Sequence, residues 1–454
     1  MFRARFIAKR GLASAAASGA LARKPLPTTH SHKRALAFAC ATAATLALVS
    51  ATTSSSLALT HHDADTSLLQ EMNQRLIRLE NAIVTYEPFL ATMRQVKQSN
   101  PTNLATKWFN ESYFNSLLPE LKLRLFKVVR SGAENPDSGM GCYAMYPDDY
   151  EVFAPFFSPV IKEYHKIKGE VHHVTNWDLG SVPKGTLPAD GKLDLSKLGL
   201  STTSMRVRVG RNLEKFPLPG AQTKAQRVQM ENELIEAFEK LMKDDNYGGT
   251  YYSLTPGNKY EISKEKYDSL VKGHVMFKDM GDDTYLASAG ISSDWPYGRG
   301  AYQSKDGGFI VWVGEEDHLR IMAMKKGVFL NDVFDRLKTA CDVVEKIAGK
   351  FAHSESYGYV TSCPTNLGTG MRASVHIKVP KLTADGTDDK AKKICQPLGL
   401  SVRGLGGEHT PIGADGTIDL SPSARLMITE AEIIAYLYKG IQLLLEAENK
   451  TGKL

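Results

Sequence analysis

One stretch of the chain, residues 362–376, places a thiol among residues that bend the backbone. It reads SCPTNLGTGMRASVH, and Cys363 is followed by Pro364, Gly368 and Gly370. Proline and glycine favour turns, and the apolar residues before and after the stretch predict a strand on each side. An isolated cysteine is more often a small buried hydrophobic residue. The backbone around Cys363 nevertheless favours a site at a turn between two strands.

Arginines recur at positions typical of strands. Arg206 and Arg208 are two residues apart and therefore share one face of a strand. A guanidinium group stays charged and binds phosphate oxygens in pairs. Neither of the glycine-rich phosphate loops GxxxxGK[ST] and GxGxxG occurs in the chain. The set is Arg206, Arg208, Arg320, Arg372 and Arg403. From spacing alone, a solvated surface is the alternative for all five.

Two acidic motifs accompany the arginines: GEEDHLR at residues 314–320 and RGLGGEHT at 403–410. CPTNLGTGMRASVH at 363–376 and DWPYGRG at 294–300 complete the set. Along the chain, these motifs follow one another in the order typical of one enzyme family. The chain resembles the phosphagen (guanidino) kinases over residues ~103–450, and among them most closely the enzymes that phosphorylate arginine.

The resemblance implies a fold and a reaction. The fold is α+β: a small all-α N-terminal domain and a larger domain with a curved antiparallel sheet flanked by helices. The reaction is the reversible transfer of the γ-phosphoryl group of ATP to the guanidino group of L-arginine or a related guanidine, giving ADP. Mg²⁺ would enter as Mg-ATP, held mostly by phosphates and water, and the sequence shows no acidic cluster typical of a protein-bound metal.

By resemblance, two carboxylates, Glu316 and Glu408, clamp the guanidinium, and Glu316 is the candidate base. A guanidinium has a pKa above ~12, so its nitrogen must be oriented and lose a proton before it attacks. Cys363 would lie against the guanidinium as a thiolate. The hydroxyl dipoles of Ser362 and Thr365, together with nearby cations, would favour that thiolate.

The nucleotide side of the site is also expected by resemblance. The arginines would neutralise phosphate charge, the dominant task in phosphoryl transfer. For the two histidines of this set, a core or surface histidine is the alternative. Beside the five arginines, the set comprises Ser204, Met205, Val207, His274, Ala373, Ser374, Val375, His376, Gly404, Leu405, Gly406, Gly407 and Glu408.

A polar, glycine-spaced loop, NPDSGMGCY, occupies residues 135–143. It is either an ordinary turn or a cradle of backbone N–H groups for a carboxylate. In the arginine enzymes the corresponding segment, from Asp137, contacts the α-carboxylate of arginine, and a tyrosine equivalent to Tyr143 completes the contact. The substrate-binding set is then Gly139, Met140, Gly141, Cys142, Tyr143, Glu316, Cys363 and Glu408.

Two features favour arginine over creatine as the acceptor. Enzymes for creatine resemble one another in a longer loop at 137–143 and in an apolar residue where Glu408 stands. Taurocyamine or another guanidine is the alternative substrate. An inactive nucleotide-binding scaffold is the alternative from a different class, and the intact acidic, thiol and arginine residues argue against it.

Three positions depart from the family's pattern: Met205 replaces a usual threonine, Gly314 a usual asparagine and Pro411 a usual acid. None of them removes a charged group from the predicted site. The change at Pro411 falls in the loop expected to close over the substrate.

The formal net charge of +6 comes from the first residues of the chain. Residues 1–62 hold eight lysines and arginines and no acid. Without these eight, 48 basic residues stand against 50 acidic ones. The body of the protein is therefore not a surface for polyanions, and nucleic acid is not an expected partner.

Residues 1–62 resemble a mitochondrial leader followed by an apolar sorting stretch. Apolar residues interleave with basic ones in residues 2–10, residues 1–34 contain no acid, and apolar residues concentrate at 35–50. Such bipartite signals deliver proteins to the intermembrane space, which is the predicted location. Retention of 35–50 as an inner-membrane anchor is the alternative.

We expect a helical extension at 63–102, an α-helical domain at 103–190 and a catalytic α+β domain at 191–454. An apolar stripe with 3-4 spacing across 66–86 predicts either a short coiled coil, which would support a homo-oligomer, or a helix packed on its own domain. Pro88 and Pro101 would bracket the exit from that helix. A Pro/Gly-rich stretch at 180–199 predicts a linker.

Strands and helices are predicted to alternate in the larger domain. The predicted strands are 204–209, 309–313, 319–324, 357–360, 375–379 and 400–403, and the predicted helices are 224–242, 330–350 and one that begins with a capping box at Thr429 and Glu432. The five cysteines are widely spaced, without a CxxC pair, and indicate neither a zinc site nor a disulfide framework.

Overall fold

The structure is a computed structural model that describes residues 86–404, 412 and 415–450. The predicted leader, the apolar stretch at 35–50 and nearly all of the stripe at 66–86 lie outside the described residues. So do Glu408, Leu405, Gly406 and Gly407 of the predicted site, and Pro411. Within the described part of the chain, no helix is long and apolar enough to cross a membrane.

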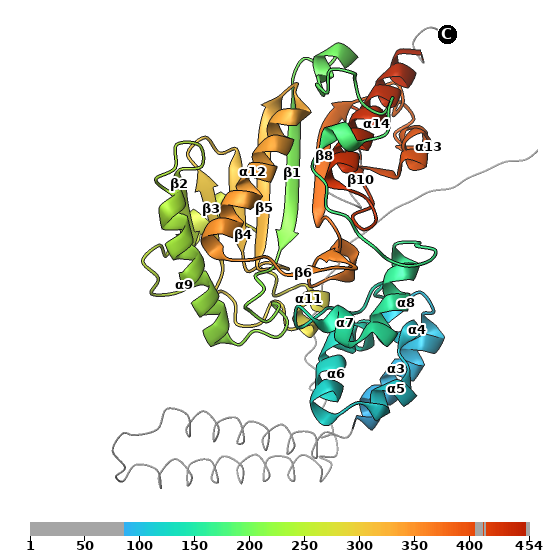
Figure 1. The fold of residues 1–454 in the computed structure, drawn as a ribbon, viewed down its shortest axis with the longest axis vertical. Coiled ribbons are helices and arrows are strands. Elements are labelled where there is room, and N and C mark those ends of the chain that lie inside the picture. Colours follow the sequence, from blue (N-terminus) through green and yellow to red (C-terminus); the bar gives the residue numbers. More distant parts are fainter. Residues whose placement is uncertain (1–85, 405–411, 413–414, 451–454) are drawn as a thin grey trace, which may run out of the picture. The chain divides into compact units, whose positions relative to one another are not determined.

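The predicted helical domain is present (Figure 1). Asparagines begin two of its helices, because Asn103 and Asn110 accept hydrogen bonds from backbone N–H groups in the first turn that would otherwise lack a partner. Aromatic side chains such as Phe114 and Phe157 are fully buried in its core. The helices are α3 (Glu87–Ser99), α4 (Leu104–Trp108), α5 (Glu111–Ser116), α6 (Pro119–Glu134), α7 (Asp149–Val152) and α8 (Ala154–Tyr164).

Helix α3 corrects the prediction that the chain leaves helical structure between Pro88 and Pro101. Pro88 lies in the first turn of α3, where its missing N–H needs no partner. Leu90 and Met93 on one face of α3 are buried in the core of the helical domain. The proline therefore begins a helix here instead of ending one.

An eight-stranded antiparallel sheet forms the larger domain, in the order β2-β3-β4-β5-β1-β8-β10-β9. This confirms the predicted α+β class. The strands are β1 (Thr203–Arg211), β2 (Gly249–Ser253), β3 (Gly300–Ser304), β4 (Phe309–Val313), β5 (Leu319–Gly327), β8 (Met371–Lys378), β9 (Leu400–Arg403) and β10 (Thr417–Pro422). A separate hairpin pairs β6 (His353–Ser354) with β7 (Gly358–Tyr359).

Three strands of the large sheet, β2, β3 and β10, and β6 of the hairpin were not predicted from the sequence. β2 (GTYYS) and β3 (GAYQS) are short and show no alternating apolar pattern. β10 (TIDLSP) alternates polar and apolar residues, but it is only six residues long and ends in proline, which weakens a strand prediction.

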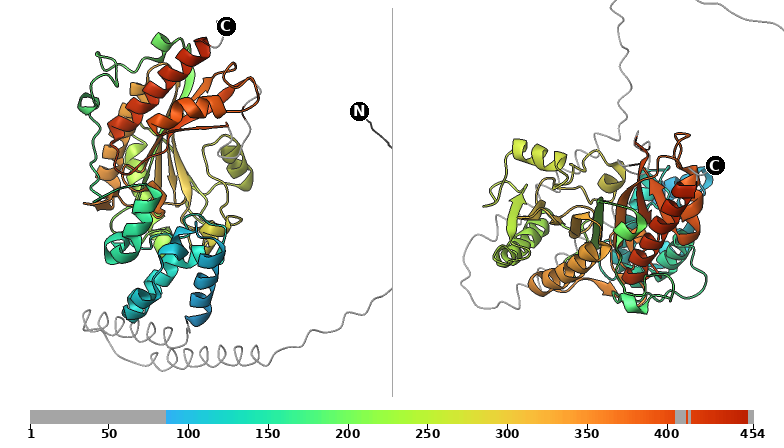
Figure 2. Two further views of the ribbon diagram at one scale, coloured as in Figure 1. Left: turned by 90° about the vertical axis from the view of Figure 1, so that its right-hand side faces the viewer. Right: turned by 90° about the horizontal axis from the view of Figure 1, so that it is seen from above.

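Three long helices cover one face of the sheet (Figure 2). They are α9 (Lys224–Leu241), α12 (Leu330–Ala348) and α14 (Glu430–Lys450), close to the predicted bounds. On β1, every second residue from Thr203 points into the core that these helices share with the sheet. The capping box at Thr429 and Glu432 is confirmed, because each side chain bonds the other residue's N–H.

On its β2–β4 side, the other face is covered by described residues. There α10 (Lys264–Lys272) and the residues after it form a small apolar cluster with Trp312 of β4, whose indole N–H donates to the carbonyl of Val275 at 2.8 Å. Strands β5, β1, β8, β10 and β9 carry polar residues on this face, which we call the open face. The remaining elements are α11 (Thr284–Ser288), α13 (Asp389–Cys395) and the 3-10 turns η1 (Leu179–Ser181), η2 (Leu195–Leu198), η3 (Pro364–Asn366) and η4 (Gln396–Leu398).

Candidate active site

The strand register brings the five predicted arginines onto the open face. Arg208 of β1 lies directly opposite Arg372 of β8. Arg320 of β5 lies opposite Gly210, two residues further along β1 on the same face. Residues paired across antiparallel strands point to the same side of a sheet, so these arginines, Arg206 and, on β9, Arg403 share one surface.

These guanidinium groups differ in their carboxylate partners. Arg320 forms a two-point ion pair with Glu315 (2.9 and 2.8 Å), and Arg372 bonds Asp419 at 3.0 Å. Arg206 and Arg208 form no ion pair with any described carboxylate. Burial lowers the pKa of both groups below the usual arginine value, and for Arg208 the neighbouring arginine charges add to the effect. The open face therefore carries cations that lack anionic partners within the described chain.

Other predicted nucleotide residues divide between the two faces of the sheet. Ser204, Ser374 and His376 lie at the same parity as the arginines and so on the open face. Side chains of Met205, Val207, Ala373 and Val375 are buried under the helices and point away from it. Because strand side chains alternate, these four residues offer a ligand no side chain, and the departure at Met205 does not alter the open face.

Two predicted nucleotide residues lie at the margins of the open face. His274 is exposed, has a positive φ of 58°, and precedes the segment that packs on Trp312. Trp312 in turn lies opposite Arg320 on the neighbouring strand. Gly404 follows β9 and is the last described residue before the gap at 405–411.

Glu316 lies in the turn between β4 and β5, which we call the acidic loop (314–318). Gly314 begins the loop with a φ of +71°, a left-handed conformation in which glycine is unstrained. Burial raises the pKa of Glu316 to about 7, and the charges of Asp317 and Glu315 add to the rise. Arg320, 3.6 Å from Glu316, opposes it. Near neutral pH this carboxyl is therefore close to half-ionised, which suits a group that accepts a proton.

Cys363 lies in the segment between β7 and β8, which we call the cysteine segment (361–370). Its side chain is 6% exposed, and its sulfur is 3.1 Å from Thr365 Oγ1. Burial, followed by the charge of Glu316, raises the pKa of the Cys363 thiol to about 12, against a smaller opposing effect of Thr365. In the free protein the thiol form of Cys363 is therefore favoured, because desolvation outweighs the hydroxyl dipole, and the thiolate against a bound guanidinium stays a prediction.

The helical domain holds the cysteine segment from one side. The hydroxyl of Tyr150 donates to the carbonyl of Thr361 at 2.7 Å, and the N–H of Ala144 donates to the carbonyl of Ser362 at 2.7 Å. The ring of His165 bonds the carbonyl of Pro364 at 2.9 Å. Three successive parts of the helical domain thus fix the backbone on both sides of Cys363.

The glycine-spaced loop at 135–143 belongs to the same site. The carbonyls of Gly139, Met140 and Gly141 accept hydrogen bonds from α4 and α6, whereas the N–H groups of 139–142 bond no described residue. Cys142 is fully buried, so we do not expect its thiol to contact a ligand. Burial raises the pKa of Tyr143, and the next causes are the charges of Cys363 and Glu316. The structure therefore brings the loop, the thiol and the acid together.

Comparisons with known proteins decide what this arrangement is. Residues 229–451 match the C-terminal catalytic domain of ATP:guanido phosphotransferases, and residues 103–162 match the N-terminal domain. An arginine kinase of Amphioctopus fangsiao is 38% identical over 369 residues, covering 80% of this chain and 99% of that protein. The chain belongs to the ATP:guanido phosphotransferase family. It is an ATP:guanido phosphotransferase enzyme, as the motifs predict.

Relatives of this guanidino kinase differ in substrate. An arginine kinase of Turbo cornutus is 40% identical over 71% of this chain and 85% of its own length. The duplicated taurocyamine kinase of Schistosoma mansoni, solved with transition-state analogue components, is 34% identical with a TM-score of 0.67. That match covers 81% of this chain, which spans about half (49%) of the duplicated enzyme. A lombricine kinase structure is 27% identical, with a TM-score of 0.63 and coverage of 75% and 93%.

Sequence reasoning missed several residues of this guanidino kinase's site. Arg425, before α14, donates to the carbonyl of Thr365 (3.4 Å), and burial lowers its pKa while the charges of Tyr164, Glu316 and Cys363 oppose that shift. With Arg372 and Arg403 it lines a cavity of about 570 Å³. In the sequence, only the position of Arg425 just after β10 could have pointed to the site, and β10 was not predicted.

Asp419 is the second missed residue, and it was missed because β10 was. It lies opposite both His376 and Arg403, and one oxygen bonds Arg372. Its other oxygen is buried without a hydrogen bond in the described chain, 3.8 Å from His376 Nε2.

Magnesium in this family comes with ATP. Among the described residues, no group of three histidine, cysteine or acidic side chains could hold a metal ion. That phosphate oxygens and water hold the ion in Mg-ATP stays a prediction.

Proposed function

We propose that this guanidino kinase phosphorylates L-arginine. The observation that carries the proposal is the row of backbone N–H groups at 139–142, which bond no described residue and stand beside Tyr143, the thiol and the acid. An α-carboxylate is an anion that such a row of N–H groups can bind. The relatives named arginine kinase, at up to 40% identity, support the same substrate.

The chemistry follows from charge. Glu316 holds the guanidinium by an ion pair, orients one nitrogen toward the γ-phosphorus and accepts the proton that this nitrogen loses. A bound guanidinium brings a positive charge next to Cys363 and so favours its thiolate, which the free protein disfavours. Glu408, in the family's matching position, would provide the second carboxylate of the clamp.

The arginines of the open face act on the phosphate groups of ATP. Arg206 and Arg208 have no carboxylate partner in the described chain and can turn to phosphate oxygens without breaking an ion pair. Their positive charge stabilises the oxygens of the phosphoryl group as it passes between donor and acceptor. Mg²⁺, bound to those oxygens, neutralises further charge.

A direct assay tests the substrate. Purified protein with Mg-ATP is incubated with arginine, taurocyamine, lombricine and creatine in separate reactions, and products are identified by phosphorus NMR. We expect an N–P bonded product with arginine at the highest kcat/KM. A higher value with taurocyamine or lombricine would reject arginine as the substrate and leave the enzyme class intact.

We also propose that the enzyme works in the mitochondrial intermembrane space. The support is the acid-free basic leader at 1–34 and the apolar stretch at 35–50. A tagged full chain expressed in eukaryotic cells, fractionated with and without rupture of the outer membrane, tests the location. Alkaline extraction separates a cleaved soluble form from a retained anchor.

A further inference from the structure

One buried amide, which faces neither substrate, joins the two catalytic segments. Asn212 follows the last residue of β1, and its side chain is fully buried. Nδ2 donates to Asp317 Oδ1 at 2.7 Å and to the carbonyl of Val360 at 3.0 Å. Oδ1 accepts from the N–H of His318 at 2.8 Å. The amide thus binds the acidic loop twice and the entry to the cysteine segment once.

Asp317 extends this connection to the residues beside the chemistry. The oxygen that accepts from Asn212 also accepts from the N–H of Ser362 at 2.7 Å. Asp317 follows Glu316 in the chain, and Ser362 precedes Cys363. A single carboxylate oxygen, oriented by one amide, therefore connects the neighbour of the acid to the neighbour of the thiol.

His318 holds the same amide in place from the other side. Its Nδ1 accepts from the N–H of Leu213 at 3.0 Å, which leaves Nε2–H to donate to the carbonyl of Pro217 at 2.8 Å. Burial lowers the pKa of His318 to about 3, so the ring stays neutral. Through these two bonds of His318, the acidic loop is held against the segment that begins with Asn212.

We propose that Asn212 is a positioning residue that sets the distance between Glu316 and Cys363, and with it the fit of the guanidinium between them. A displacement of about 1 Å at a reacting group can cost about 100-fold in rate. Phosphate binding by the arginines on β8 and β9 does not pass through this amide. The proposal rests on guanidino kinase activity and holds for arginine, taurocyamine or lombricine as substrate.

Two substitutions and a matched control test it. Asn212→Ala removes all three side-chain bonds. Asn212→Asp keeps the size and the acceptor for His318 but sets a second carboxylate against Asp317. The control is Asn331→Ala, because Asn331 also joins two segments, accepting from the N–H of Leu193 (2.8 Å) and donating to the carbonyl of Gly191 (3.2 Å), away from the acidic loop and the cysteine segment.

We expect Asn212→Ala to lower kcat about 100-fold while KM for ATP changes by less than about twofold. Asn212→Asp should lower kcat further, because of repulsion, although it preserves volume. A second measurement is the rate at which iodoacetamide alkylates Cys363 without any substrate, followed by peptide mass at several pH values. This rate should change in both Asn212 variants and stay at the wild-type value in Asn331→Ala.

The proposal is overturned if kcat and alkylation of Asn212→Ala match the wild type, or if Asn331→Ala lowers kcat equally. Should Asn212→Asp fail to fold, Asn212→Ser replaces it, because a hydroxyl keeps one donor. A kcat for Asn212→Ser at or below that of Asn212→Ala would also overturn the proposal. The alkylation measurement needs no guanidine, so it is independent of the substrate proposed above.

Discussion

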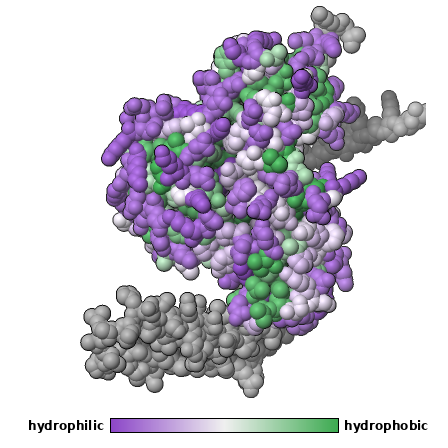
Figure 3. Space-filling model, viewed as in Figure 1, coloured by the Kyte–Doolittle hydropathy of each residue, from purple (hydrophilic) through white to green (hydrophobic). Residues whose placement is uncertain are grey.

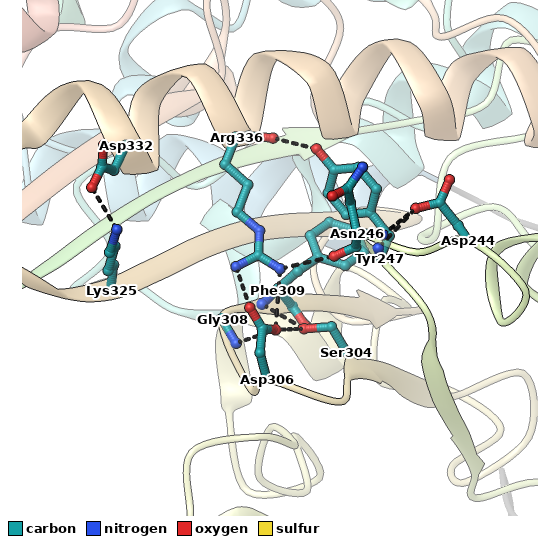
Figure 4. A network of polar contacts seen from close by, with 10 residues as sticks. All are labelled: Asp244, Asn246, Tyr247, Ser304, Asp306, Gly308, Phe309, Lys325, Asp332 and Arg336. Carbon is teal, nitrogen blue, oxygen red and sulfur yellow. Dashed lines mark hydrogen bonds and ion pairs between the residues drawn. The ribbon is translucent and has the colours of Figure 1, made fainter.

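Arg336 of α12 and two arginines of the open face differ in whether a carboxylate of the described chain pairs with them. Arg336 of α12 forms a two-point ion pair with Asp306, at 2.6 and 3.1 Å (Figure 4). Its third contact is the carbonyl of Asn246 at 3.2 Å. On the open face, Arg206 and Arg208 have no carboxylate partner among the described residues. The first region is closed by its own chain, and the second is left for a ligand.

The carboxylate of Asp306 shows what a closed network does. It also accepts from the hydroxyl of Ser304 and from the N–H of Gly308, so the β3–β4 turn and α12 are joined through one group (Figure 4). The Arg336 guanidinium lowers the pKa of Asp306. The face of the molecule drawn in Figure 3 mixes hydrophilic and hydrophobic residues and gives no such distinction. Ion pairing therefore separates Arg336 from Arg206 and Arg208, whereas Arg320 and Arg372 of the open face have carboxylate partners of their own.

The largest effect should follow from the acid of the open site. Glu316→Gln keeps the size of the side chain but removes its charge and its ability to accept a proton. We expect kcat to fall about 1,000-fold with KM for ATP nearly unchanged, measured by steady-state kinetics with saturating guanidine. A kcat near the wild-type value would show that Glu316 is neither base nor clamp.

Arg208→Ala should separate the two regions most clearly. Removing a cation that lacks a partner should lower kcat/KM for Mg-ATP about 100-fold, because phosphate charge is left without compensation. The same change should raise the free energy of unfolding in urea, since it relieves repulsion from Arg206, Arg320 and Arg372. If Arg208→Ala instead lowered both the free energy of unfolding and kcat/KM, the loss of activity would follow from lost structure. Arg208 would then belong with Arg336.

The sequence could predict most of this arrangement but not all of it. The alternation of β1 placed Arg206 and Arg208 on one face, the resemblance assigned them to phosphate, and the motifs around Glu316 and Cys363 are specific. Asp419 was not, because its strand is short, ends in proline and was not predicted. The high pKa of Cys363 was missed for another reason, since burial is a property of the fold and cannot be read from neighbouring hydroxyls.

The pH dependence of stability offers a finer test at Glu316. Its pKa is raised from 4.5 to about 7 in the folded protein. The folded state therefore binds the proton more tightly than the unfolded chain, and stability falls as pH rises from 4.5 to 7. Glu316→Gln should consequently be more stable than the wild type by about 3 kcal/mol at pH 8, with the gap closing toward pH 4.5. Urea unfolding at both pH values measures it.

The smallest effect is expected in the closed network. Arg336→Met keeps the apolar stem but removes the ion pair, and the side chain of Asp306 is 55% exposed, so solvent already screens the interaction. We expect a loss of about 1 kcal/mol in the free energy of unfolding and a kcat within about twofold of the wild type. Asp306→Asn should give the same pattern, because it removes the other partner of the same pair. If either variant lowered kcat as Arg208→Ala does, the ion pair with Asp306 would no longer distinguish Arg336 from Arg206 and Arg208. The two regions would then have to be told apart by distance from the substrate instead of by charge balance.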